Sequence, residues 1–216
     1  DLRDALVVGQ MALCLLLLIA AGLCGRSFAE LHAVDPGFNT RDVLVVPLQA
    51  KGYTEQTIGP FYEDLAARLA VLPGIRSVSF TRYFPMLGGS SASFPAGLID
   101  GYTPEKDEFP VVHFQEVGPD YFETTGIAIS QAPDAVLLKN RATVAWVNES
   151  FARRYWPGQA PIGKRVGPHI VSGVVRDSQI RNLTDKPGPF MYLQELQPRA
   201  TSLTLMVRTD GKAQAA

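Results

Sequence analysis

Residues 5–25 read ALVVGQMALCLLLLIAAGLCG and carry no formal charge between Asp4 and Arg26. At a rise of about 1.5 Å per residue, a helix of this length spans roughly 30 Å, the thickness of a bilayer's hydrocarbon core. A helix also satisfies its own backbone polar groups in lipid. Gln10 is the only strongly polar side chain in the run, so the polar stripe of a soluble amphipathic helix is missing. The run therefore predicts a transmembrane helix.

Two other interpretations of this run fit less well. A cleaved secretory signal has an apolar core of about 7 to 15 residues, shorter than this one, and here Asp1 and Asp4 precede the core. A lipoprotein processing site at Cys24 would need a small residue before the cysteine, and Leu23 stands there. Both comparisons favour a helix that stays attached to the protein.

Small residues recur four positions apart in the predicted helix, with Ala5 followed by Gly9 and Ala21 followed by Gly25. This spacing lets two membrane helices approach closely, and Gln10 could add an interhelical hydrogen bond of about 1 kcal/mol. Gly9, Gln10, Ala21 and Gly25 are therefore candidate packing residues against a partner helix. The alternative is an anchor that faces lipid on all sides.

Composition limits the classes of partner. The 216 residues have a net charge of -1 with acidic and basic residues interspersed, so no basic face for nucleic acid and no polybasic membrane patch is expected. Cys14 and Cys24 are the two cysteines, about 15 Å apart along the helix, so the globular part has no disulfide framework. The chain begins without methionine, and we expect it to be an excerpt of a longer polypeptide.

The rest of the chain has the mixed periodicity of an α+β domain. Residues 42–80 read as strand, amphipathic helix and strand, a unit whose right-handed crossover makes the two strands parallel. Asn148 is an expected N-cap. Further strands are predicted at residues 111–117, 143–147, 169–175 and 202–208, further helices at 119–125 and 150–156, and a loop-rich boundary at 81–110.

One motif imitates a phosphate-binding loop. Residues 158–165 read GQAPIGKR, which fits that motif except that Arg165 replaces the Ser or Thr that would bind magnesium. The segment also follows a helix end, whereas a phosphate loop follows a strand and opens a helix. The prediction here is a turn that leads into a strand.

No catalytic, cofactor or metal site is predicted. His32, His113 and His169 have no ligand partners at metal-binding spacing. Residues 88–92, GGSSA, lack the final glycine of a nucleophile elbow and read as a flexible loop. The carboxylates that could be argued into an acid-base pair, but that read better as surface groups, are Asp120, Glu123 and Asp177. The sequence does not predict an enzyme.

Seven segments in one order resemble the permease of the macrolide-exporter and FtsX-like class of ABC transporter, most closely the duplicated permeases of acidobacteria. They are LVVGQMALCLLLLIAAGLCGRSF at residues 6–28, VDPGF at 34–38, LPGIRSVS at 72–79, VGPDYFETTGI at 117–127, VNESFARRYWPGQAPIGKRV at 147–166, IVSGVVRD at 170–177 and TLMVRT at 204–209. The family's usual Gly-Arg-Asp-Phe-like turn is replaced by AISQAPDA at residues 128–135. Any contact that the family makes there is in doubt.

The resemblance implies a location and a fold. The protein would lie in the bacterial inner membrane, with residues 1–34 as the transmembrane helix and its extension, and with a two-lobed periplasmic domain. A ferredoxin-like porter lobe would begin at 35–82 and continue, truncated, at 198–216, and 83–197 would be an inserted strand-rich lobe. The strand at 202–208 would belong to an incompletely closed sheet and be poorly protected from hydrogen exchange.

The resemblance also implies a function. The chain would be a non-catalytic permease segment that couples ATP hydrolysis by a separate ATPase subunit to export or to mechanical work in the periplasm. Its partners would be that ATPase, a second permease copy, the lipid bilayer and, as a further option, a periplasmic protein. The helix would act as a rigid lever joined directly to the porter lobe. The alternative is a membrane-anchored extracytoplasmic domain that recognises a partner or ligand without transport.

Overall fold

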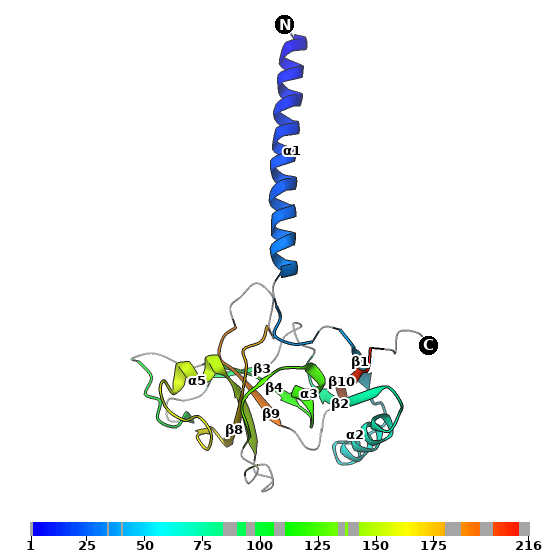
Figure 1. The fold of residues 1–216 in the computed structure, drawn as a ribbon, viewed down its shortest axis with the longest axis vertical. Coiled ribbons are helices and arrows are strands. Elements are labelled where there is room, and N and C mark those ends of the chain that lie inside the picture. The colour runs from blue at the N-terminus through cyan, green and yellow to red at the C-terminus, as the bar shows by residue number, and fades with distance from the viewer. Residues whose placement is uncertain are drawn as a thin grey trace. The chain divides into compact units, whose positions relative to one another are not determined.

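The computed structural model describes residues 2–33, 35–39, 41–83, 90–93, 98–105, 111–133, 137, 143–179, 187–194 and 201–211. The chain divides into two compact units, Asp1–Asp35 and Pro36–Ala216. The first unit is one helix, and the second is built on a mixed β-sheet with helices packed against it (Figure 1). This arrangement confirms the α+β class.

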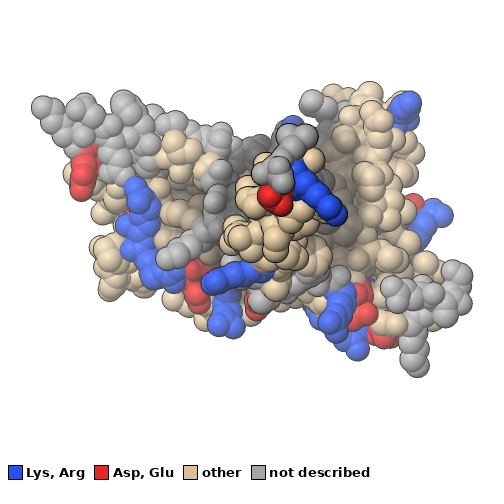
Figure 2. Space-filling view, turned by 90° about the horizontal axis from the view of Figure 1, so that it is seen from above, with Lys and Arg blue, Asp and Glu red and all other residues tan. Residues whose placement is uncertain are grey.

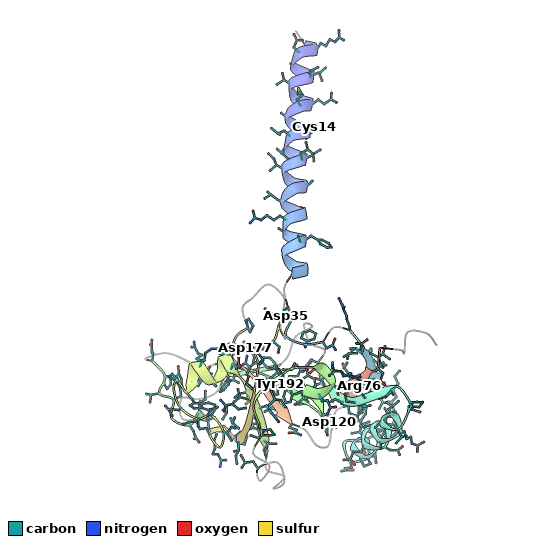
Figure 3. All side chains as sticks on the ribbon, in the orientation of Figure 1. Cys14, Asp35, Arg76, Asp120, Asp177 and Tyr192 are labelled. Atoms are coloured by element: carbon teal, nitrogen blue, oxygen red, sulfur yellow. The ribbon has the colours of Figure 1, made fainter. Side chains whose placement is uncertain are left out.

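Helix α1 (Leu2–Ala33) is the predicted membrane helix. Its part Arg3–Ala29 is long and apolar enough to cross a bilayer, with a mean hydropathy of 2.5. The large apolar side chains of α1 are exposed, from 51% at Val7 to 71% at Leu18. Figure 3 shows side chains projecting all around the helix, with Cys14 near its middle.

The second unit contains a ten-stranded sheet among the described residues, with the strand order β1-β10-β2-β4-β9-β6-β8-β5, while β3 pairs with β4 and β7 with β8. The strands are β1 (Val43–Gln49), β2 (Ile75–Thr81), β3 (Ser90–Ser93), β4 (Val111–Val117), β5 (Ile129–Gln131), β6 (Val144–Asn148), β7 (Arg165–Val166), β8 (His169–Val175), β9 (Phe190–Gln194) and β10 (Ser202–Thr209). The helices are α2 (Glu55–Ala70), α3 (Tyr121–Thr125) and α5 (Glu149–Tyr155).

The predicted strand-helix-strand unit is confirmed by β1, α2 and β2. Both strands pair antiparallel with β10, so they run parallel to each other. Helix α2 lies beside these three strands at one end of the unit (Figure 1) and buries Ile58 and Tyr62 completely. Val78, Phe80 and Leu205 complete this first core beneath the helix.

The structure argues against the expectation that residues 202–208 are poorly protected from hydrogen exchange. Strand β10 lies between β1 and β2 and pairs with both, so it is the central strand of the three rather than an edge strand. Its side chains Leu205, Met206 and Val207 are buried. Backbone amides that are bonded and buried in this way exchange slowly, so we expect β10 to be well protected.

The other edge of β1 has no strand beside it among the described residues. Leu44 and Val46 are 53% and 42% exposed. They share a strand face with Leu48, which packs against the core under α2, because side chains alternate along a strand. The helix therefore covers β10 and β2 but leaves an apolar part of β1 uncovered.

The second half of the sheet has its own core. Strands β4 and β9 pair in parallel, β6 and β9 pair antiparallel, and β6 and β8 pair in parallel. Helix α5 packs against them near β8 (Figure 1), and Val147, Phe151 and Trp156 are buried there. The indole Nε1 of Trp156 donates a hydrogen bond of 2.6 Å to the carbonyl of Asp100.

The two halves meet where β2 lies beside β4, a junction at which Thr81 and Val117 form the single registered pair. Helix α3 strengthens the junction, because its Thr124 hydroxyl donates a 3.1 Å hydrogen bond to Ser77 Oγ of β2. A third core cluster contains residues of α3, β4 and β10 together. The sheet is thus continuous across the junction, and the division into two lobes stays a prediction.

Candidate functional site

The candidate packing residues of α1 lie on an open surface. Gly9, Gln10, Ala21 and Gly25 are all exposed. A Cβ atom added to Gly9 or Gly25 would meet no other atom within 4 Å, so nothing within this chain requires glycine there. Their role in packing against a partner helix stays a prediction.

The chain enters the second unit through residues 36–39, which are fixed to it immediately. The carbonyl of Pro36 accepts a 2.8 Å hydrogen bond from the amide of Gln179, which follows β8. Gly37 has a φ of +75° and packs closely on the same segment. A Cβ on Gly37 would lie 2.8 Å from the carbonyl oxygen of Asp177 and 2.9 Å from Cα of Ser178, which are distances that real Cβ atoms do not adopt.

A second contact follows two residues later. The amide of Asn39 donates a 2.7 Å hydrogen bond to the carbonyl of Thr125, the last residue of α3. Gly126 gives the room for this approach, since a Cβ there would lie 3.1 Å from Cβ of Asn39. Between the two contacts, Phe38 packs against the core cluster that α3 shares with the sheet. Residues 36–39, which we call the entry segment, are thus held at both ends.

Asp177 connects the first contact to helix α5. Its carboxylate accepts hydrogen bonds of 2.8 Å from both the amide and the hydroxyl of Ser150, and one of 2.6 Å from Nη2 of Arg153. In Figure 3, Asp177 lies beside α5 and above Tyr192. The ion pair with Arg153 is partly solvated, with the Asp177 side chain 19% exposed. Asp177 is therefore a structural acceptor rather than a free carboxylate.

The predicted N-cap of α5 is confirmed. Oδ1 of Asn148 accepts a 2.9 Å hydrogen bond from the amide of Phe151. The same oxygen accepts a 2.9 Å bond from the amide of Phe190, and Nδ2 donates a 2.8 Å bond to the carbonyl of Gly188. One buried side chain thus both starts α5 and holds the beginning of β9.

The three carboxylates considered for acid-base chemistry do not form a site with one another. Asp120 precedes α3 in a left-handed conformation with φ of 56°, and Glu123 lies on α3, where its backbone carbonyl accepts a hydrogen bond from Arg208.

Near Asp177, Ser178 Oγ and Tyr192 OH share a 3.1 Å hydrogen bond. Burial raises the pKa of Tyr192, so its hydroxyl stays neutral and serves as a hydrogen-bonding group.

The segment that imitates a phosphate loop is a turn, as predicted. Residues 158–164 follow α5 and lead into the two-residue strand β7, which pairs with β8. Nζ of Lys164 donates a 2.8 Å hydrogen bond to Oε1 of Gln159 within the same turn and lies 5.8 Å from the ring centroid of Trp156. The ammonium group of Lys164 thus interacts with neighbouring side chains of this chain, Gln159 and Trp156.

The loop prediction for residues 88–92 is partly wrong. Ser90–Ser93 form β3, which pairs antiparallel with β4, while residues 88 and 89 lie outside the described residues.

Of the histidines considered as metal ligands, His32 has a side chain outside the described residues. Within the described ranges, no group of three or more His, Cys, Asp or Glu residues is placed to hold a metal ion. His169 is half-buried, and this burial lowers the pKa of its imidazole.

Charged side chains do not gather into one region on the face shown in Figure 2, where blue and red groups are interspersed among the coloured residues. Ion pairs form locally between described residues. Arg82 Nη1 lies 2.9 Å from Glu116 Oε2 across the junction of β2 and β4, and Arg68 lies 2.8 Å from Asp64 on α2.

Comparison with known proteins gives likenesses to solved structures. The sequence matches no protein-family model and no curated protein. The periplasmic region of MacB from Actinobacillus actinomycetemcomitans is similar in structure, with a TM-score of 0.45 and 16% identity over 82% of this chain and 78% of that one. The extracellular domain of the noncanonic ABC-type transporter YknZ from Gram-positive bacteria has a TM-score of 0.44 and 11% identity over 79% of this chain and 86% of that one.

Sequence reasoning missed the contacts of the entry segment. Residues 35–38, DPGF, contain the proline and glycine that indicate a break after the helix. The partners of this break, Asp177 and Thr125, are far away in sequence, and no local pattern connects them to Gly37. The positive φ of Gly37 is the one feature that a sequence reader could have suspected.

Proposed function

We propose that this chain is a non-catalytic segment of an ABC transporter permease of the macrolide-exporter and FtsX-like class. Helix α1 would cross the bacterial inner membrane, and the unit Pro36–Ala216 would lie in the periplasm. A separate ATPase subunit would hydrolyse ATP in the cytoplasm, and the permease would convert that motion into export or mechanical work. A second permease copy and a periplasmic protein are the further partners that the class implies.

The observation that carries this proposal is the contrast within one continuous chain. Helix α1 exposes its large apolar side chains, which lipid would cover, and the folded unit begins at Pro36, just beyond the helix. The seven ordered sequence segments supply the class. The uncovered side chains Leu44 and Val46 on β1 support the further proposal that a helix and a strand after Ala216 complete a porter sheet.

The test starts from the full-length membrane protein that contains this chain. Affinity capture from detergent-solubilised membranes should bring down an ATPase subunit, and the reconstituted pair should couple ATP hydrolysis to transport. A flexible Gly-Ser linker inserted after Asp35 should leave ATP hydrolysis in place and abolish that coupling. The same linker inserted after the exposed Gly52, in the turn before α2, is the matched control and should preserve coupling. Capture without any ATPase would refute the proposal.

The second candidate is a membrane-anchored interaction domain without transport. The observation in its favour is the same uncovered edge of β1, because an unpaired strand beside exposed Leu44 and Val46 can accept a strand from another protein. A full gene with a single hydrophobic segment would favour this candidate. Three further apolar spans in the same gene would favour the permease.

A further inference from the structure

We infer that the entry segment, residues 36–39, is the joint through which movement of α1 is delivered to both halves of the sheet at once. This inference rests on the proposed function, since it names the residues by which the permease would transmit motion. The first step is the contact of Pro36 and Gly37 with the segment after β8. The 2.8 Å hydrogen bond from Gln179 to Pro36 holds the entry segment against the segment after β8, and the space beside Gly37 is too small for a Cβ atom. The two segments are therefore in close contact.

The second step is the contact at the end of α3. Asn39 is bonded to Thr125 at 2.7 Å, and Phe38 is packed into the core cluster that contains Val117 and Met206. The entry segment is therefore fixed at two points before β1 begins at Val43. A pull on Pro36 reaches these two contacts before it can stretch β1.

The third step is the path of the load beyond these contacts. From Asp177 it passes to α5 through the bonds to Ser150 and Arg153. From α3 it passes to β2 through the bond of Thr124 to Ser77, and to β10 through Arg208, whose Nη1 donates a 2.6 Å bond to the Glu123 carbonyl. The expected lever joined to the porter lobe stays a prediction, and the partners of the entry segment, Thr125 and residues 177–179, add contacts within residues 83–197 to it.

The joint is tested first by hydrogen exchange on the full chain in lipid nanodiscs. Gly37→Ala adds a Cβ where Asp177 and Ser178 leave no space, so the amides of Gln179 and Asn39 should exchange about tenfold faster or more. Gly52→Ala is the matched control, because Gly52 also has a positive φ, of +85°, but a Cβ there would meet nothing within 4 Å. Unchanged exchange in Gly37→Ala would overturn the joint.

A rescue experiment separates a local joint from general unfolding. A Cβ on Gly37 would lie 3.1 Å from Cβ of Ser178, close enough for a disulfide after a small shift. The variant with Gly37→Cys and Ser178→Cys, in a background with Cys14 and Cys24 replaced by alanine, should show fast exchange at Asn39 when reduced. The disulfide ties residues 37 and 178 together covalently, so exchange at Asn39 should be slower in the oxidised variant than in the reduced one. Equal exchange in the two redox states, with the disulfide verified by mass spectrometry, would count against the joint.

Coupling is measured with the same variants in the reconstituted transporter. Gly37→Ala and the reduced double-cysteine variant should hydrolyse ATP but lose most transport, whereas Gly52→Ala and the oxidised variant should retain it. Fast exchange with full transport would overturn the coupling role while leaving the permease proposal intact. If no ATPase associates with the wild type, the permease proposal and the coupling role fail together, and the exchange measurements alone decide whether the joint exists.

Discussion

Leucine and valine side chains have opposite surroundings in α1 and in the unit Pro36–Ala216. In α1, Leu16, Leu17 and Leu18 are 58% to 71% exposed, while in β10 Leu203, Leu205 and Val207 are 6% to 7% exposed. The residue types are similar, so residue type alone does not explain the difference in exposure. Burial stabilises the sheet by removing apolar area from water, whereas the exposed side chains of α1 would achieve the same in the lipid that we propose surrounds them.

The largest effect that this comparison predicts is the loss of a core side chain. Trp156→Ala should lower the free energy of unfolding of the sheet unit by about 3–5 kcal/mol, because it leaves a cavity and an unpaired carbonyl at Asp100. Leu17→Ala should change it by less than about 0.5 kcal/mol, since that side chain is 58% exposed and belongs to α1. Pulse proteolysis in urea measures both, and equal losses in the two variants would break the comparison.

The next effect is a charge placed in α1, the proposed membrane helix. Leu17→Arg should disfavour membrane insertion by about 3 kcal/mol, because an arginine at a helix centre is costly in lipid where leucine is favourable. The unit Pro36–Ala216 should unfold at the same urea concentration as in the wild type. Alkaline extraction of membranes measures the first quantity, with Leu17→Phe as the control. A shift of the urea midpoint in Leu17→Arg would mean that α1 stabilises the sheet directly.

A smaller effect is expected at the junction of α5 and β9. Asn148→Ala removes the helix cap and leaves the amide of Phe190 unpaired, so the unfolding free energy of the unit should fall by about 2 kcal/mol. Asn148→Leu keeps a side chain of similar size but removes the oxygen acceptor and the donor, so its loss should be at least as large. Urea unfolding of both variants tests this, and a purely steric role of Asn148 would leave Asn148→Leu close to the wild type.

The smallest effect concerns pH. Burial lowers the pKa of His169, so the folded state prefers the neutral imidazole. The stability that follows from this preference is complete above the unfolded pKa of about 6.5 and is lost as the pH falls through the lower folded pKa. The unfolding free energy should therefore drop more between pH 7.5 and 5 in the wild type than in His169→Gln. Parallel pH curves for the two proteins would show that His169 does not contribute.

Much of the fold could be predicted from local patterns. The helix at residues 5–25, the strand at 169–175, the helix ended by Pro73 and the cap at Asn148 all have signals within a few residues. Strand β9, Phe190–Gln194, was missed although it lies in the middle of the sheet. Its residues Phe190, Met191 and Tyr192 are buried in succession, so it shows no alternation of polar and apolar residues that a sequence reader could detect.

The position of β10 and the contacts of the entry segment depend on tertiary structure. The residues SLTLMVRT indicate a strand but do not show which strands lie beside it. The hydrogen-exchange protection that we expect of β10 follows from its position between β1 and β2. Likewise SSAS at β3 becomes a strand because β4 offers it a partner. Gly37 could be recognised as a turn residue, but the space that it must leave for Asp177 is set by residues 140 positions away.

Both sulfhydryl groups of the protein, Cys14 and Cys24, are free and exposed on α1. In the proposed membrane arrangement, the wild-type chain carries two intrinsic depth markers, one near the middle of the helix and one nearer its end. A membrane-impermeant maleimide should react with Cys24 faster than with Cys14, whereas a lipid-soluble maleimide should reach both. The topology of the helix can thus be mapped by mass spectrometry in native membranes, without introducing a single new label site.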